Sequence, residues 1–441
     1  MSATTNSANT TQPTPLQRLI AQMHPNAFSA LLCLVIGLLT GSFAALLKLM
    51  IGAVSRWLTN GLATNHGNWI LLILPVAGIL LTGIFTRYII KDNIAHATEK
   101  IKHQLAEHVE YLSPKLIFGP MIASTLTLGF GGSAGSEGPI ATVGSAIGGN
   151  LSRWCGLPPR VITMMIGCGA GAGIAGIFKA PVGGMLFTLE CLGLPLSTAA
   201  VVALLATCVV SALTAVWLSG GLLDLPFIKH APFPYEYLPA IILLGACCGM
   251  YALYYRSTGS TTERILESIK NPWIANTVSG ITIAIMLFVF PALYGEGYGV
   301  MGTLLNNPVP TLGDCGPLYF LRRDHYTLML IAAGILLCKG VAAYSTNSGG
   351  GVAGEFAPAL FAGAMAGWLF ATLANTVFGL ALPVGVFVLS GMAAVMGQAV
   401  NAPLMAIFLA VEMTASYDYF LPVGIAGAAS WITVNLIRRL N

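Results

Sequence analysis

Residues 131–147 read GGSAGSEGPIATVGSAI, and they place one carboxylate, Glu137, directly before a Gly-Pro pair that suits the first turn of a helix. Only 8% of the 441 residues are charged, whereas 56% are hydrophobic. Ionisable side chains within so apolar a chain are costly and usually serve a function. Glu137 is therefore the first candidate for a functional residue.

Composition predicts an integral membrane protein, because a mean hydropathy of +0.79 leaves too few polar groups to cover a water-soluble surface. Continuous apolar runs close to the roughly 20 residues that cross a bilayer recur along the chain. They lie at 27–50, 69–90, 199–218, 238–254, 275–293 and 328–344. Short alternating segments would indicate a β-barrel, so these continuous runs predict an all-α membrane fold with many tilted and interrupted helices.

The chain divides into four parts by polarity. We expect residues 1–26 to form a cytoplasmic tail with a short surface helix, 27–220 a first membrane repeat, 221–236 a linker and 237–441 a second membrane repeat. No soluble C-terminal domain is expected. Bases within 87–111 favour the cytoplasmic side for that segment. Segments 256–272 and 304–325 are predicted to be water-exposed loops, and frequent Gly and Pro within 116–195 predict short or interrupted helices.

An internal repeat is the strongest pattern in the sequence. Residues 135–139, GSEGP, and 354–358, GEFAP, share the pattern Gly-x-x-x-Pro. Each is followed by an Ala-Pro pair and then by a glutamate at the same Pro-to-Glu spacing, namely Pro181 and Glu190 in the first half and Pro403 and Glu412 in the second. Repeats with corresponding Gly/Pro-interrupted segments are typical of transporters whose half-helices meet near the bilayer midplane. We therefore predict two repeats of inverted topology.

Helix N-termini that converge inside a membrane favour a small anion as the substrate. Each N-terminus presents N–H donors without intrahelical partners and about half a positive charge. Pro in the first turn needs no donor, and Gly lets the backbone approach an ion. The chain thus predicts an anion site without requiring Lys or Arg.

Other function classes fit the sequence less well. The formal charge of +4 is dispersed, so no nucleic-acid partner is predicted, and the nine cysteines lack metal-ligand spacing, so no metal or cofactor is predicted. Residues 171–176 match the dinucleotide pattern GxGxxG but lie in an apolar run, where small residues instead let membrane helices pack closely. An intramembrane enzyme is kept as the remote alternative.

The two motifs at 135–139 and 354–358 resemble signatures of the CLC family of chloride channels and proton-coupled chloride exchangers. Residues 293–298 (LYGEGY), the SGGG run at 348–351 and the glutamate-containing segment 412–417 add to the resemblance, which covers about 27–438 and is of the prokaryotic type without CBS domains. It implies a homodimer with one chloride pathway in each subunit, in a multi-pass protein of the cell membrane.

The resemblance also implies roles for individual residues. Glu137 is expected to be the gate, whose ionised side chain occupies an anion site and whose protonated form vacates it. Ser136, Gly138, Glu355, Phe356 and Ala357 are expected to contribute to the anion cradle. Tyr417 is expected to donate its phenol to chloride at the inner end of the path.

Three departures from the family pattern bear on proton coupling. A serine of the first filter motif has no counterpart, and His96 is a candidate for its place. The internal proton glutamate of many exchangers corresponds to Cys191, which favours a passive, gated channel. In contrast, Glu355 stands where the family more often has an apolar residue, and with Glu190 it is a candidate proton relay. We lean to H⁺/Cl⁻ exchange, with the channel as the alternative.

Each candidate also has a purely structural interpretation. Glu137 is favoured at a helix N-terminus whatever its function. Glu355 could pair with a base such as Lys339, and Glu190 and its repeat equivalent Glu412 could be helix-end or interface acids. Tyr417 could be an interfacial aromatic residue, and His96 could simply be solvated.

Overall fold

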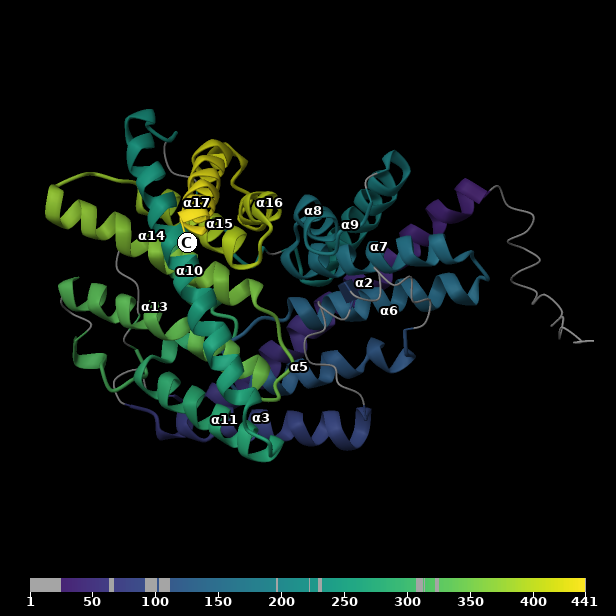
Figure 1. Ribbon diagram of the computed structural model, residues 1–441, viewed down its shortest axis with the longest axis horizontal. Helices are drawn as coiled ribbons and strands as arrows, with labels where there is room; N and C mark the ends of the chain where they lie inside the picture. The colour runs from purple at the N-terminus through teal and green to yellow at the C-terminus, as the bar shows by residue number, and fades with distance from the viewer. Residues whose placement is uncertain are drawn as a thin grey trace, which may run out of the picture.

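The computed structural model describes residues 25–62, 67–91, 101–102, 112–195, 197–221, 223–228, 232–306, 312, 314–321 and 325–440. Within these ranges the regular secondary structure is helical (Figure 1), and one isolated β-bridge joins Gly135 to Gly354. The predicted tail at 1–24 and the segment 92–100, which contains His96, lie outside the described residues.

The first half of the chain carries α2 (Pro25–Thr59), η1 (Trp69–Leu72), α3 (Leu74–Ile84), the π-helical turn η2 (Phe85–Ile90), η3 (Pro114–Ile117), α5 (Gly119–Gly129), α6 (Glu137–Trp154), α7 (Pro159–Phe178), α8 (Pro181–Glu190) and α9 (Thr198–Leu218). The second carries η4 (Tyr235–Tyr237), α10 (Leu238–Glu267), α11 (Pro272–Val289), η5 (Pro291–Leu293), α12 (Tyr298–Asn306), η6 (Tyr319–Leu321), α13 (His325–Ser348), α14 (Phe356–Phe378), α15 (Val384–Ala399), α16 (Pro403–Met413), η7 (Tyr417–Tyr419) and α17 (Phe420–Leu440).

Nine helical segments within the described ranges are long and apolar enough to cross a bilayer, and all six apolar runs predicted from the sequence fall within them or overlap them. Short helices were predicted throughout 116–195, but α7 at 20 residues is long enough to span. The prediction of a loop at 256–272 was also wrong, because α10 continues to Glu267. No Pro lies between Arg256 and Glu267. Hydroxyl groups in this part of α10 donate hydrogen bonds to carbonyls of the preceding turn, as Thr261 does to Ser257 at 2.8 Å.

Corresponding helices of the two halves begin in the same way. Pro181 opens α8 and Pro403 opens α16, in each case after a residue in the left-handed conformation, Lys179 (φ 57°) and Asn401 (φ 59°). Pro139 and Pro358 each take the third position of their helices, α6 and α14. Because Pro fits the first turn without needing a donor, the two Gly-x-x-x-Pro motifs placed the N-termini of α6 and α14 correctly.

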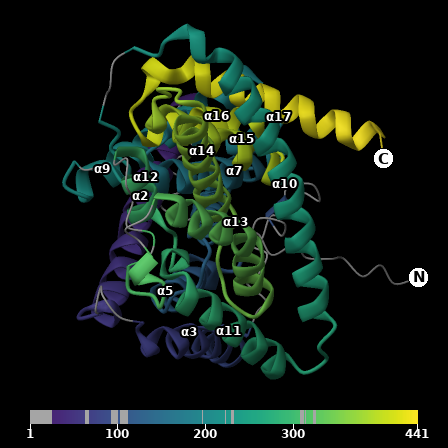
Figure 2. The ribbon, with the colours of Figure 1, turned by 90° about the vertical axis from the view of Figure 1, so that its left-hand side faces the viewer.

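Helices of the two halves pack against each other as well as within each half. Helix α3 lies beside α11 in both views (Figures 1 and 2), and α8 contacts α16. Within the first half, α6 and α7 meet backbone to backbone, since a Cβ on Gly144 would overlap the Gly169 carbonyl and the reverse also holds. The glycines of 171–176 face neighbouring helices in the same way. Gly173, for example, faces the α6 backbone at Ile140, so the prediction of close helix packing there is confirmed.

Candidate functional site

The two Gly-x-x-x-Pro motifs are joined directly. Gly135 donates its N–H to the Gly354 carbonyl at 2.9 Å, and Gly354 donates to the Gly135 carbonyl at 2.6 Å. This antiparallel bridge satisfies backbone groups that would otherwise be unpaired inside the membrane. It also brings the N-termini of α6 and α14 to one point in the interior of the molecule.

The Glu137 carboxylate lies at that point and is 1% exposed. Its Oε1 accepts a hydrogen bond from the Ala357 N–H in the first turn of α14, at 2.9 Å. Within the described part of the chain, nothing donates a hydrogen bond to Oε2, which is also buried. A Cβ on either Gly135 or Gly354 would overlap the carboxylate, so a side chain at either position would displace Glu137 from this place. A carboxylate thus occupies a cradle made from the start of the opposite repeat.

The predicted cradle residues of both motifs meet around this carboxylate. Ser136 precedes the first residue of α6, and the Gly138 N–H lies against Gly354, where a Cβ would approach it to 2.8 Å. Phe356 is the first residue of α14, and Glu355 precedes it. Unpaired N–H donors at two helix starts favour a negative charge, because they add partial positive charge where water is absent.

Lys339, which the sequence offered as a partner for Glu355, lies elsewhere. Its buried ammonium donates to Ser133 Oγ at 2.9 Å and lies 4.6 Å from the centroid of the Phe361 ring. The positive charge of Lys339 attracts the Glu137 carboxylate. Glu355 instead accepts a hydrogen bond from the Tyr344 phenol of α13 at 3.0 Å.

A polar cavity of about 370 Å³ reaches the second motif from one side of the molecule. Gly354, Glu355, Phe356 and Tyr344 are among the residues that line it. The remaining lining residues include Lys102, Glu190, Cys191, Arg256, Glu263 and Asn401. Because Lys102 belongs to the segment that the distribution of bases assigns to the cytoplasm, this cavity opens toward the predicted cytoplasmic side.

Glu190 and Glu412 each bind the N-terminus of a helix in the other repeat. Glu190 at the end of α8 accepts the N–H groups of Leu404 (3.3 Å) and Met405 (2.8 Å) at the start of α16. Glu412 on α16 accepts those of Val182 (3.1 Å) and Gly183 (2.8 Å) at the start of α8. The two carboxylates thus cap each other's helices, as the structural interpretation of these acids requires. Glu190 also borders the cavity, next to Cys191.

Tyr417 contacts Glu412, one of the two glutamates at the α8–α16 contact. It begins a short 3-10 turn after α16, is 52% exposed, and donates its phenol to Glu412 Oε1 at 3.2 Å. It is not part of the lining of the cavity at Glu355. The role of Tyr417 at the inner end of the anion path stays a prediction.

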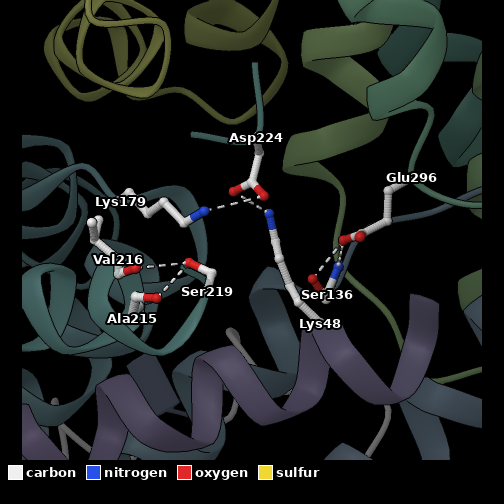
Figure 3. A network of polar contacts seen from close by, with 8 residues as sticks. All are labelled: Lys48, Ser136, Lys179, Ala215, Val216, Ser219, Asp224 and Glu296. Carbon is white, nitrogen blue, oxygen red and sulfur yellow. Dashed lines mark hydrogen bonds and ion pairs between the residues drawn. The ribbon is translucent and has the colours of Figure 1, made fainter. Parts of the chain in front are cut away.

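Four charged residues near the cradle were not singled out from the sequence as site residues. Figure 3 shows Asp224, from the segment between the halves, between Lys48 of α2 (2.7 Å) and Lys179 at the end of α7 (3.4 Å). Beside Lys48, Glu296 accepts hydrogen bonds from Ser136, through the N–H at 3.0 Å and Oγ at 2.5 Å. Glu296 lies within the quoted segment 293–298, so an acid in an apolar stretch was the available signal.

The architecture defines a class of protein, a membrane transporter in which helix N-termini from two repeats face a buried anionic group. Comparison with known proteins makes the assignment specific. The sequence profile described as voltage gated chloride channel matches residues 78–435, so the chain belongs to this family, the CLC family. It is a multi-pass membrane protein of CLC-type anion transport and not an enzyme.

Relatives from bacteria and plants align over most of the chain. The chloride channel protein described as ClcB-like from Ralstonia nicotianae is 27% identical over 383 residues, which cover 83% of each protein. The voltage-gated ClC-type chloride channel ClcB of Citrobacter koseri is 27% identical, over 80% of this chain and 82% of the relative. The chloride channel protein CLC-e of Arabidopsis thaliana is 27% identical over 92% of this chain and 60% of its own length.

Solved structures share the fold. A slow cyanobacterial Cl⁻/H⁺ antiporter superposes with a TM-score of 0.80 at 22% identity, covering 94% of this chain and 96% of the antiporter chain. A CLC-type fluoride/proton antiporter superposes with a TM-score of 0.74 at 23% identity, covering 93% of this chain and 96% of the other. The CLC fold predicted from the sequence is thereby confirmed.

Proposed function

We propose that the protein exchanges chloride for protons through a path at the N-termini of α6 and α14, with Glu137 as the gate. The observation that carries the proposal is the Glu137 carboxylate on the Ala357 N–H, at 2.9 Å and 1% exposed. An anionic side chain in this position occupies donors that a dehydrated chloride would use. Protonation removes its charge and weakens its hold on Ala357, so that chloride can take its place.

Proton coupling requires a second acid that connects Glu137 to water, and we assign that role to Glu355. Its carboxylate lines the polar cavity and is held by Tyr344, two residues before the N–H that binds Glu137. Glu190 borders the same cavity, but its oxygens already accept two N–H groups of α16. Protons therefore pass between the cavity and Glu137 by way of Glu355, which serves in place of the glutamate absent at Cys191.

The test is a reversal-potential measurement on purified protein in liposomes. With a chloride gradient held constant, a pH gradient shifts the reversal potential of an exchanger and leaves that of a passive chloride channel unchanged. A chloride-driven uphill proton movement is expected. Chloride current without any response to the pH gradient would establish the channel alternative, which Cys191 favours.

Two further parts of the proposal are tested separately, the anion selectivity in the same vesicles and the oligomeric state in detergent. Replacing chloride by fluoride or nitrate on one side measures selectivity, and we expect chloride to carry the larger flux. The family resemblance also leads us to propose a homodimer with one path in each chain. Light scattering on the detergent-solubilised protein tests this, with the mass of two chains as the expected result.

A further inference from the structure

Glu296 binds the donors of Ser136, which lies immediately before the first residue of α6. One carboxylate oxygen accepts both the Ser136 N–H, at 3.0 Å, and Ser136 Oγ, at 2.5 Å. Ser136 comes immediately before Glu137, so two carboxylates from different parts of the chain are bound at adjacent positions of one helix start. Charge-assisted hydrogen bonds of this kind are about twice as strong as neutral ones.

The two carboxylates are close enough for their charges to interact. The charge of Glu296 acts on Glu137, and the charges of both act on the phenol of Tyr298. Within the described residues, the buried Tyr298 Oη has no hydrogen-bond partner, and neither has Glu137 Oε2. Buried polar atoms are normally satisfied, so these two atoms leave hydrogen-bonding capacity for a polar species during transport.

Positive charge compensates Glu296 from one direction. Lys48 Nζ lies 4.3 Å from the centroid of the Tyr298 ring, and its charge acts on Glu296. Lys48 is itself bound to Asp224, which also binds Lys179 (Figure 3). This charged group is partly exposed at Lys48 and Asp224, so positive charge next to Glu296 extends to the molecular surface.

We propose that Glu296 is a second acidic gate of the anion path, which competes with the transported anion for the N–H and hydroxyl of Ser136. The inference rests on the proposed function, because it requires that anions pass Glu137. An anion reaches the cradle only after it displaces the Glu296 carboxylate from Ser136. The negative charge of Glu296 also disfavours ionised Glu137, because like charges at short range repel.

The direction of the pH effect follows from the groups that face the two acids. These are Lys48 on α2, Asp224 between the halves, Tyr255 on α10, Tyr298 on α12 and Lys339 on α13. The two lysines favour ionised Glu137, whereas Glu296 favours the protonated form. Removing the charge of Glu296 therefore stabilises ionised Glu137, so a more acidic pH is needed to open the path.

The test compares Glu296→Gln with the parent and with a matched control, Glu412→Gln. The glutamine at 296 can still accept from Ser136, so a residue that only positions the loop would be replaced without effect. In calorimetry at a pH below the midpoint, where Glu137 is protonated, we expect chloride binding to tighten by about fivefold, and we expect the midpoint of the flux–pH curve to move down by about one unit. Glu412→Gln also neutralises a carboxylate bound to helix N–H groups, but at the start of α8 and not of α6, and it should change neither quantity.

A second variant protects the test against misfolding. Glu296→Asp keeps the charge and should keep the parental pH midpoint. Parental chloride affinity and pH midpoint in Glu296→Gln would overturn the second gate. The proposed function is tested separately by Glu137→Gln, since a Glu137→Gln variant with parental transport would reject the anion path itself, whatever Glu296→Gln does.

Discussion

Replacing Glu137 by glutamine tests the gate most directly, because the amide has nearly the shape of the carboxylate but no charge. The carboxylate accepts the Ala357 N–H at 2.9 Å. A hydrogen bond to a charged group contributes about 1.5–3 kcal/mol and a neutral one about 0.5–1.5 kcal/mol. The substitution thus weakens the competitor by about 1–1.5 kcal/mol, which corresponds to about five- to tenfold tighter chloride binding.

Truncation to alanine removes the competitor altogether and should have a larger effect. Glu137→Ala loses the whole of the charged hydrogen bond, so chloride binding should tighten by up to about a hundredfold. The expected order of affinities is therefore parent, then Glu137→Gln, then Glu137→Ala. Isothermal titration calorimetry in detergent measures this order, and the Glu412→Gln variant, which alters a carboxylate on another helix start, should match the parent.

The pH response provides an independent reading of the same gate. In the parent, chloride flux should rise as the pH falls, since protonation discharges Glu137 and releases the Ala357 N–H. In Glu137→Gln the flux should be retained but should no longer follow pH through this group, and proton coupling should be lost. Parental affinity together with a parental pH response in both variants would refute the assignment of Glu137 as the gate.

Three further predictions concern the proposed proton relay Glu355, the packing of α6 against α7, and the hydrogen bonds of Glu412 at the start of α8. Glu355→Gln should keep chloride flux but abolish the shift of reversal potential with pH, because the amide cannot carry a proton to the gate. Gly169→Ala should reduce the free energy of unfolding by about 1–3 kcal/mol and so lower the thermal midpoint in detergent, because its Cβ would overlap the Gly144 carbonyl. Gly52→Ala is the control and should leave the midpoint unchanged, since no described atom lies within 4 Å of the added Cβ. Glu412→Ala should also lower the midpoint, because two N–H groups at the start of α8 would lose their acceptor, and Glu412→Gln should restore part of the loss.

The packing of the helices placed several candidate residues where their sequence neighbourhood did not indicate. Glu190 and Glu412 occupy equivalent positions in the repeat, yet the sequence did not reveal that each caps the other's helix. Tyr417 lies in a segment that matches the family, but the turn after α16 leaves it half-exposed. Glu296 accepts hydrogen bonds from the N–H and the hydroxyl of Ser136, which lies 160 positions away in the sequence. Such pairings depend on how the two halves dock, which no local pattern encodes.

The sequence by itself determined the membrane environment, the repeat, the starts of α6 and α14, and the isolation of Glu137 as a carboxylate that needs a partner. These follow from local chemistry, since hydropathy indicates the surrounding solvent and the Gly-x-x-x-Pro pattern indicates a helix start. Only the tertiary structure decided that the partner is the Ala357 N–H of the opposite repeat and that Glu296 binds the residue next to Glu137. The physical reason is that a half-helix becomes an anion site only when a second N-terminus is brought against it, as the bridge between Gly135 and Gly354 does.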